Sequence, residues 1–137
     1  MAWIVDTCLV IDVLEDDPQF GERSAVFLDE MSVPGLALCP VSYVELAPAF
    51  LGDDARQRDF LDKVGIQYKD DWTWADTSNA HRIWHEHIMA RRDAGAKKRP
   101  VADLLIGAFA LRFEGLLTRN VADFAKSIPG LTVRSPA

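Results

Sequence analysis

The opening segment, AWIVDTCLVID at residues 2–12, constrains this chain more than any other stretch. Residues 3–5 are apolar and β-prone, Asp6 follows with Thr7 beside it, and residues 8–11 are apolar again. An apolar run without polar alternation is typical of a strand that is covered on both faces within a parallel sheet. A carboxylate at the end of such a strand lies at the crevice where open α/β sheets bind their ligands. Asp6 could equally cap a following helix, because Asp is a preferred N-cap residue.

Segments typical of strands and helices alternate along the rest of the chain. Strands are expected at residues 36–39, 65–68, 115–118 and 131–133, and helices at 17–31, 41–50, 55–64, 77–92, 101–113 and 121–125. This alternation predicts an α/β fold with a mostly parallel central sheet that helices cover on both sides, a three-layer α/β/α arrangement. A length of 137 residues predicts a single domain over 1–137.

The charge of the chain is negative overall but unevenly distributed. The formal net charge is −6 and the sequence pI is near 4.9, which by itself argues against a nucleic-acid partner. Acids that surround a metal are counted as negative charges in this sum, although the site carries much less negative charge once the metal is bound. A basic cluster precedes the segment of Asp103 and is the candidate for binding a nucleic acid: Arg91, Arg92, Lys97, Lys98 and Arg99.

Neither a membrane span nor an export signal is expected. No apolar run approaches the ~20 residues that a bilayer requires. Asp6 and Asp12 interrupt the only N-terminal stretch that could serve as a signal peptide, so a cytoplasmic location is expected. Asp12 is interpreted as structural or as a support for the first motif. Cys8 and Cys39 lie in apolar runs and are expected to be buried free thiols.

Four acidic residues stand at similar places in the predicted pattern: Asp6, Glu45, Asp103 and Asp123. Strand ends and the helix starts that follow them share one edge of a parallel sheet. Each acid also has a structural explanation. Glu45 could complete a capping box with Ser42. The helix dipole could stabilise Asp103 near the start of a helix, and Asp123 could simply be solvated.

A convergence of these acids would favour a divalent cation. Neighbouring carboxylates raise one another's pKa unless a positive charge lies among them. Oxygen-rich acidic sites suit Mg²⁺ or Mn²⁺. Such a cation activates water and stabilises charge on a phosphoryl group, so metal-dependent phosphodiester hydrolysis is the expected chemistry.

Four ordered segments and a downstream PGLTV carry a family resemblance: IVDTCLVIDVL, SYVELAPAF, PVADLLIGAFAL and LLTRNVADF. Together they resemble the PIN-domain family, and more narrowly the ribonuclease toxin of a VapBC-type toxin–antitoxin pair. The resemblance covers nearly the whole chain. It implies a small PIN-like α/β/α fold, an Mg²⁺- or Mn²⁺-dependent endoribonuclease, a homodimer, and neutralisation by a cognate antitoxin.

The resemblance also implies roles for individual residues. By position, it places Asp6, Glu45, Asp103 and Asp123 in an acidic quartet, with Thr118 and Asn120 as a polar pair and Thr7 in support. Some family members carry an acid where this chain has Asn120. The fourth metal ligand is therefore either Asn120 or Asp123.

Other functions stay open beside the nuclease. A catalytically inactive PIN-like fold would serve as a protein-binding module, and a receiver-like phospho-acceptor would share the α/β alternation. His81 and His85 have the i, i+4 spacing of zinc ligands, but the sequence offers them no clear partner ligands. Trp72 and Trp74 lie in an acidic stretch and favour a protein interface.

Overall fold

The chain folds around one parallel sheet of five strands, and the computed structural model describes residues 1–94 and 101–136. The strand order is β3-β2-β1-β4-β5, and every neighbouring pair is parallel. The strands are β1 (Trp3–Val5), β2 (Leu36–Ala37), β3 (Ile66–Gln67), β4 (Gly115–Leu117) and β5 (Val133–Arg134). The predicted α/β class with a parallel central sheet is therefore confirmed.

Seven α-helices and one 3₁₀ helix occupy the connections within the described residues. They are α1 (Thr7–Leu14), α2 (Gly21–Glu30), α3 (Pro40–Glu45), η1 (Ala47–Phe50), α4 (Asp54–Val64), α5 (Trp74–Ala94), α6 (Val101–Ala110) and α7 (Val121–Ser127). None of the helices in this described part combines the length and the apolar character needed to cross a bilayer.

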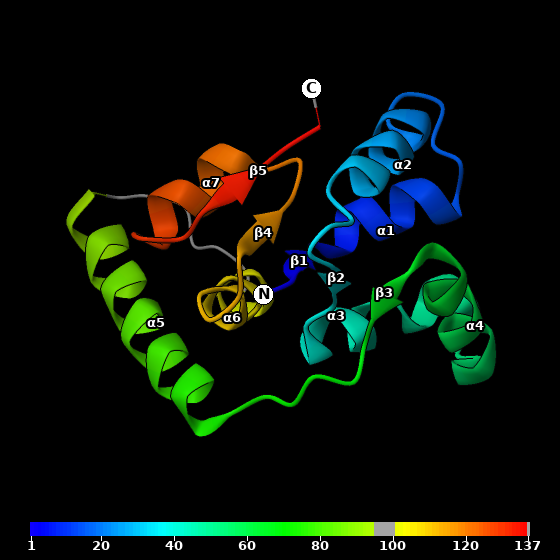
Figure 1. Ribbon diagram of the computed structural model, residues 1–137. Coiled ribbons are helices and arrows are strands. Elements are labelled where there is room, and N and C mark those ends of the chain that lie inside the picture. Colours follow the sequence, from blue (N-terminus) through cyan, green and yellow to red (C-terminus); the bar gives the residue numbers. More distant parts are fainter. Residues whose placement is uncertain (95–100, 137) are drawn as a thin grey trace.

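Two apolar cores lie against the sheet. Trp3 and Val5 of β1 pack into one core with residues of α1, α2 and α4, whereas Ile4 packs into a second core with residues of α5, α6 and α7. Alternate side chains of a strand point to opposite faces, so the two cores lie on opposite faces of β1. Figure 1 shows α1 and α2 on one side of the strands and α5 on the other. The finer expectation of a three-layer, PIN-like arrangement is not confirmed.

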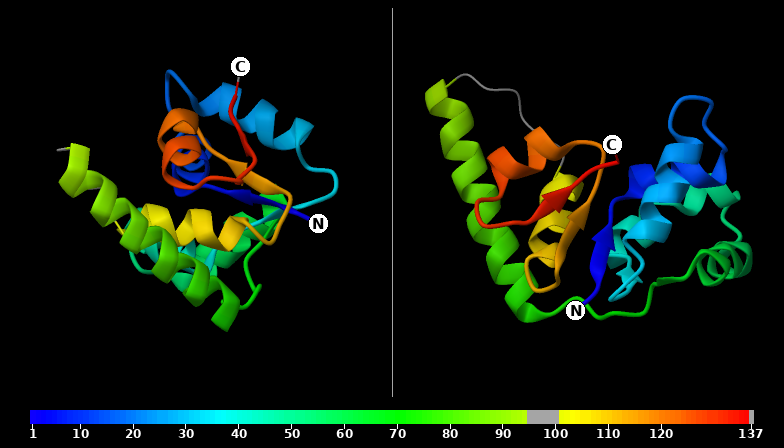
Figure 2. Two further views of the ribbon diagram at one scale, coloured as in Figure 1. Left: turned by 90° about the vertical axis from the view of Figure 1, so that its left-hand side faces the viewer. Right: turned by 45° about the horizontal axis from the view of Figure 1, so that its top comes forward.

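The long helix α5 begins earlier than predicted. It starts at Trp74 and not at residue 77, because a capping box precedes it: the Thr73 amide donates to Asp76 Oδ2 (2.9 Å) and the Asp76 amide donates to Thr73 Oγ1 (3.2 Å). Trp74 is consequently a helical residue, and it is 81% exposed. The two views of Figure 2 place α5 alongside α6.

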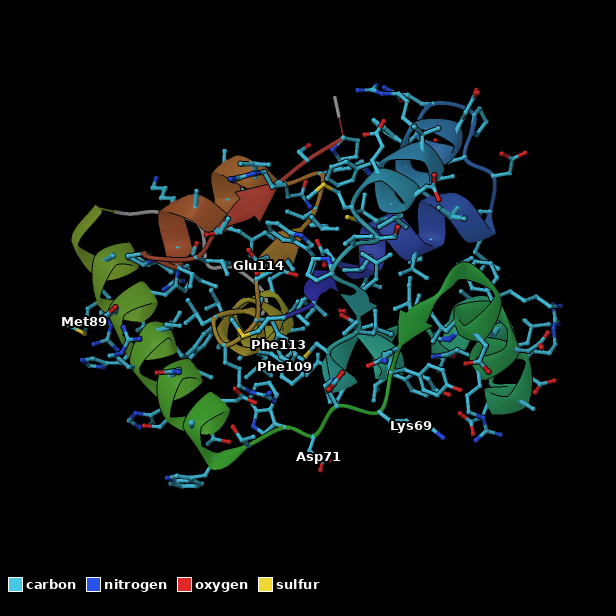
Figure 3. The ribbon with its side chains drawn as sticks, in the orientation of Figure 1. Lys69, Asp71, Met89, Phe109, Phe113 and Glu114 are labelled. Carbon is cyan, nitrogen blue, oxygen red and sulfur yellow. The ribbon has the colours of Figure 1, made fainter. Side chains whose placement is uncertain are left out.

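Arg112, just beyond α6, fastens the start of α5. Its Nε donates to Asp76 Oδ1 (3.0 Å), and its guanidinium lies 4.7 Å from the ring centroids of both Phe109 and Phe113. Its Nη2 donates to Asp76 Oδ2 (3.0 Å) and to the Asp71 carbonyl. Figure 3 shows Phe109 and Phe113 side by side.

The helix predicted over residues 41–50 is also corrected. The structure divides it into α3, which begins at Pro40, and η1, which carries Pro48 near its start. Proline removes an amide donor and disfavours helical geometry in the preceding residue, so a continuous α-helix cannot pass through this point unbroken. The helix predicted over 17–31 is similarly shorter and begins at Gly21.

A candidate acidic site at the carboxyl edge of the sheet

Asp6 lies directly after β1 and both of its oxygens are engaged. Oδ1 accepts from the Thr7 amide (2.9 Å), which makes Asp6 the N-cap of α1. Oδ2 accepts from Thr118 Oγ1 (2.7 Å) and from Cys8 Sγ (3.4 Å). The capping interpretation of Asp6 is thus correct, and it coexists with contacts that reach across to the end of β4.

The environment of Asp6 disfavours its negative charge. Asp6 is buried, and burial is the main cause that raises the pKa of its carboxyl above the usual value of 3.8. The negative charge of Asp103 raises this pKa further, whereas hydrogen bonds from Thr118 and Cys8 lower it. Asp103 in the first turn of α6 therefore acts electrostatically on Asp6.

Glu45 joins the same edge through Thr7. Thr7 Oγ1 donates to Glu45 Oε1 (2.8 Å), a link between residues 38 positions apart. The capping box with Ser42 does not form, because α3 begins at Pro40 with Cys39 as its N-cap. Ser42 Oγ is buried and has no hydrogen-bond partner among the described residues. The Glu45 carboxylate thus faces the residues that follow β1.

The other predicted site residues are less closely connected. The backbone amide of Asn120 donates to Thr118 Oγ1 (3.1 Å), and Asn120 is exposed. Asp123 is exposed in the first turn of α7, and within residues 1–94 and 101–136 no hydrogen bond joins it to the other three acids. Lys97, Lys98 and Arg99 lie outside the described residues.

Asp12 forms a buried ion pair that is separate from the contacts of Asp6. It is 3% exposed and accepts from Arg119 Nε (2.8 Å) and Nη2 (3.2 Å) and from Ser24 Oγ (2.9 Å). Phe20 lies 4.1 Å from the guanidinium of Arg119. The expectation that Asp12 is structural agrees with this buried ion pair, which ties α1 to α2 and to the end of β4.

The side-chain oxygens at this edge of the sheet are of the kind that bind a hard divalent cation, but the acidic side chains do not surround a common point. Carboxylate and hydroxyl oxygens are the ligands that Mg²⁺ prefers. Within the part of the chain that the structure describes, no three Asp, Glu, His or Cys residues gather as a group that could hold a metal.

Sequence reasoning missed two residues of this region. Cys8 is half-buried, and its thiol donates to Asp6. The only signal in the sequence was its position two residues after Asp6. Arg119 is bound to Asp12, a pairing across 107 positions that no local pattern of the sequence indicates.

Comparisons with known proteins show the fold alone. No family model matches the chain, and no curated protein matches it. A solved structure described as VapBC2 from Rickettsia felis bound to a DNA fragment from their promoter matches with a TM-score of 0.67, at 17% identity and over 98% of both chains. FitAcB from Neisseria gonorrhoeae matches with a TM-score of 0.59, at 20% identity, over 97% of this chain and 96% of that chain.

The predicted membership of the PIN-domain family, as a VapC-type ribonuclease toxin, is wrong by these comparisons. No family model supports it, and the VapBC2 and FitAcB structures match at identities of 17% and 20%, which show the fold alone. The physical reason lies in the motifs. Short apolar runs followed by acids and capping residues recur wherever parallel strands end, so their order is a weaker marker of ancestry than of a parallel sheet. The chain shares a fold with chains of these two structures.

Proposed function

We propose that this chain is an endoribonuclease that depends on Mg²⁺ or Mn²⁺ and acts in the cytoplasm within a toxin–antitoxin pair. Asp6, Glu45 and Asp103 are its proposed metal ligands, with Asp123 or Asn120 completing the set. The matches to the VapBC2 complex and to FitAcB support the toxin–antitoxin context. A single three-layer domain is part of the proposal, supported by the two cores on opposite faces of β1.

The observation that carries the proposal is the chain of contacts between two carboxylates that are distant in sequence. Thr7 donates its amide to Asp6 (2.9 Å) and its hydroxyl to Glu45 (2.8 Å), and the charge of Asp103 acts on Asp6 from α6. A buried acid whose pKa is raised by a second acid is poorly stabilised as an anion. A cation at this edge would reverse that effect, so the electrostatics favour an ion here.

The residues around the acids would position them. Each oxygen of an ionised carboxylate has two acceptor sites, so Asp6 keeps acceptor capacity beyond its bonds from Thr7 and Thr118. The Thr7 hydroxyl donates to Oε1 of Glu45, and within the described residues Oε2 accepts no hydrogen bond. When bound, a divalent cation lowers the pKa of water and neutralises charge on a phosphoryl group.

The partners in this proposal are an RNA substrate, an antitoxin protein and a second copy of the chain. The basic residues Lys97, Lys98 and Arg99 would steer the RNA backbone toward the edge that carries Asp6, which an acidic protein requires in order to meet a polyanion. In this proposal the basic segment serves RNA binding, whereas the acids serve catalysis. Neutralising Lys97, Lys98 and Arg99 should weaken RNA binding and leave the fold intact.

The test is cleavage of a broad panel of single-stranded and hairpin RNAs, with Mn²⁺ and with chelator. Wild-type protein should cleave only with the metal, and Asp6→Asn or Glu45→Gln should reduce the rate at least ~100-fold, as expected for loss of a catalytic group. Asp54→Asn is the matched control, because Asp54 is an exposed acid paired with Arg58 on α4. Equal rates for Glu45→Gln and wild type would return Glu45 to a structural role.

A second candidate is a binding module without catalysis. It is favoured by the open arrangement of the acids within the described residues. An apolar groove of about 420 Å³ is lined in part by Trp72, Trp84 and Leu105, and it would suit a protein partner. If wild-type protein cleaves no RNA in the panel, this candidate replaces the nuclease.

A further inference from the structure

The thiol of Cys8 lies at the centre of the contacts between the start of α1 and the end of β4. Its Sγ donates to Asp6 Oδ2 (3.4 Å) and lies 3.8 Å from Thr118 Oγ1. Thr118 Oγ1 itself donates to the same oxygen of Asp6 (2.7 Å). The thiol, the hydroxyl and the carboxylate oxygen therefore form a closed triangle of contacts.

The place of Cys8 on α1 explains why it faces this triangle. Asp6 is the N-cap of α1, and Cys8 is the second residue of that helix. Cys8 and Asp12 are four positions apart, so they lie on one face of the helix. On that face Asp12 binds Arg119 (2.8 Å), the residue directly after Thr118. The face of α1 that carries Cys8 is thus held against the turn that follows β4.

A second contact joins Cys8 to the backbone of this turn. The amide of Arg119 donates to the sulfur of Cys8. The Arg119 side chain is bound to Asp12, and its guanidinium lies 4.1 Å from the ring centroid of Phe20. A shift of the turn would break these contacts. The sulfur is therefore fixed from the side of the turn, and it can hold Asp6 in place.

Cys8 and Thr118 together set the rotation of the Asp6 carboxylate. The Thr7 amide holds Oδ1 (2.9 Å), whereas the thiol and the hydroxyl both hold Oδ2. Each oxygen of an ionised carboxylate has two acceptor sites, so the two donors to Oδ2 use its capacity. The acceptor site that remains is on Oδ1. This is the oxygen that shares Thr7 with Glu45, whose Oε1 accepts from the Thr7 hydroxyl (2.8 Å).

We propose that Cys8 is a positioning residue for Asp6 in the acidic site. With the Thr118 hydroxyl, its thiol occupies Oδ2 and leaves Oδ1 for a divalent cation on the side of Glu45. The role toward the cation rests on the proposed function, whereas the positioning rests on the contacts of Cys8 alone. Groups that orient a metal-binding carboxylate change the metal affinity about 10- to 100-fold when they are removed.

Calorimetric titration of the full chain with Mn²⁺ measures this role without cleavage. Cys8→Ala should raise Kd at least about 10-fold, because Oδ2 loses a donor and the carboxylate can rotate. Cys8→Ser should stay within about threefold of wild type, because a hydroxyl also donates to Oδ2. Both variants lose the volume of the sulfur, so the difference between them separates the hydrogen bond from packing. Cys8→Val keeps the volume without a donor, should bind as weakly as Cys8→Ala, and replaces it if the smaller residue unfolds the protein.

Ser24→Ala is the matched control. The Ser24 hydroxyl is buried and donates to Asp12 (2.9 Å), so its loss disturbs the neighbouring ion pair but removes no donor from Asp6. This variant should leave the Kd for Mn²⁺ unchanged. Melting temperatures in chelator verify the fold of every variant.

The backbone amide of Asn120 reports the positioning without any metal. It donates to Thr118 Oγ1 (3.1 Å), so its NMR signal follows the hydroxyl that contacts Asp6. In chelator, this signal should shift in Cys8→Ala and return toward its wild-type position in Cys8→Ser.

Two results of the titration would overturn the proposal. They are a Cys8→Ala protein that binds Mn²⁺ as tightly as wild type, and a Cys8→Ser protein that binds it as weakly as Cys8→Ala, since the thiol would then only pack. If wild-type protein binds no Mn²⁺, the proposed nuclease fails and the Asn120 signal decides the role of Cys8. A shift that serine reverses upholds the positioning, whereas a signal that does not shift, or that serine does not restore, overturns it.

Discussion

Asp6 must serve as a helix cap and as a candidate metal ligand with the same two oxygens. The cap uses Oδ1 and the contact to Thr118 uses Oδ2, so the carboxylate is fixed in orientation before a cation could bind. Burial and the charge of Asp103 raise its pKa, and both effects destabilise the ionised form. The residue is therefore well oriented but electrostatically unfavourable in the metal-free protein.

Replacement of Asp6 by Asn should raise the melting temperature in chelator at pH 7. An acid whose pKa is higher in the folded state binds protons more readily when folded, so stability falls as pH rises from 3.8 through the raised value. Asn removes the charge and keeps an oxygen that accepts from the Thr7 amide. The gain should narrow on acidification, because the wild-type carboxyl then becomes neutral.

Thermal unfolding of both proteins between pH 4 and pH 7 checks this. Glu30→Gln controls for the general loss of one negative charge, since Glu30 is exposed at the end of α2. The prediction would be contradicted if Asp6→Asn were less stable than wild type at both pH 7 and pH 4, by equal amounts. The cap and the Thr118 contact would then outweigh the electrostatic cost of the charge on Asp6.

Cys39 should resist alkylation in the native protein. Burial raises the pKa of its thiol from 9.0 to about 11, which lowers the thiolate fraction at pH 8 about 100-fold, and the side chain has no measurable exposure. Mass spectrometry after iodoacetamide treatment should find Cys39 unmodified in the native protein and modified in urea. Native labelling as fast as that of free cysteine would contradict the buried placement.

At the scale of single residues, the sequence showed which residues could act but not what they touch. Glu45 could be recognised as an acid after a strand, yet its bond to Thr7 depends on how α3 meets α1. Asp12 could be recognised as structural, whereas its partner Arg119 is far away in sequence. Side chains that meet only through tertiary structure leave no local pattern.

Among the elements, the start of α5 illustrates what a local sequence can hide. The acidic, polar stretch before it resembles a loop, but Thr73 and Asp76 form a reciprocal capping box inside it. Asp76 is 1% exposed and also binds Arg112, so one carboxylate joins the start of α5 to the end of α6. This junction holds the start of α5 against the end of α6.

Replacement of Asp76 by Ala should lower the free energy of unfolding by about 2–4 kcal/mol. Loss of an N-terminal capping bond costs about 1 kcal/mol, and loss of a charge-assisted bond to Arg112 costs about 1.5–3 kcal/mol. Urea denaturation measures the change. Glu86→Ala, which removes an exposed partner of Arg82 on the same helix, should cost less than about 0.5 kcal/mol. Equal losses in the two variants would show that Asp76 has no special role.

The order and type of most elements could be predicted, because apolar runs and helical periodicity are local properties. The strands at residues 3–5, 36–37, 115–117 and 133–134 all lie within or beside predicted runs. Helix ends were less accurate where a proline divided a helix, as at Pro48, or where side chains capped it, as at Thr73. The presence of helical residues is thus easier to infer than the point at which they start.

For the whole molecule, the parallel sheet brings distant acids to one edge. β1 and β4 are neighbours, so the residues after them, Asp6 and Thr118, meet although 112 positions separate them. Arg119, which directly follows Thr118, pairs with Asp12, so opposite charges also lie close together at this edge. The fold shared with chains of the VapBC2 and FitAcB structures is consistent with a site at this edge but does not identify its chemistry.

The central claim is that Asp6 and Asp103 bind one divalent cation together, and thermal unfolding with Mn²⁺ tests it most directly. A ligand that binds only the folded state stabilises it by RT ln(1 + [L]/Kd), about 2.7 kcal/mol at 100 times Kd. Millimolar Mn²⁺ should therefore raise the melting temperature of wild-type protein by several degrees and leave that of Asp6→Asn with Asp103→Asn unchanged. The double variant Asp54→Asn with Asp59→Asn, two exposed acids of α4, should respond like wild type. A shift by Mn²⁺ that survives the loss of Asp6 and Asp103, or that is absent from wild-type protein, would contradict the account.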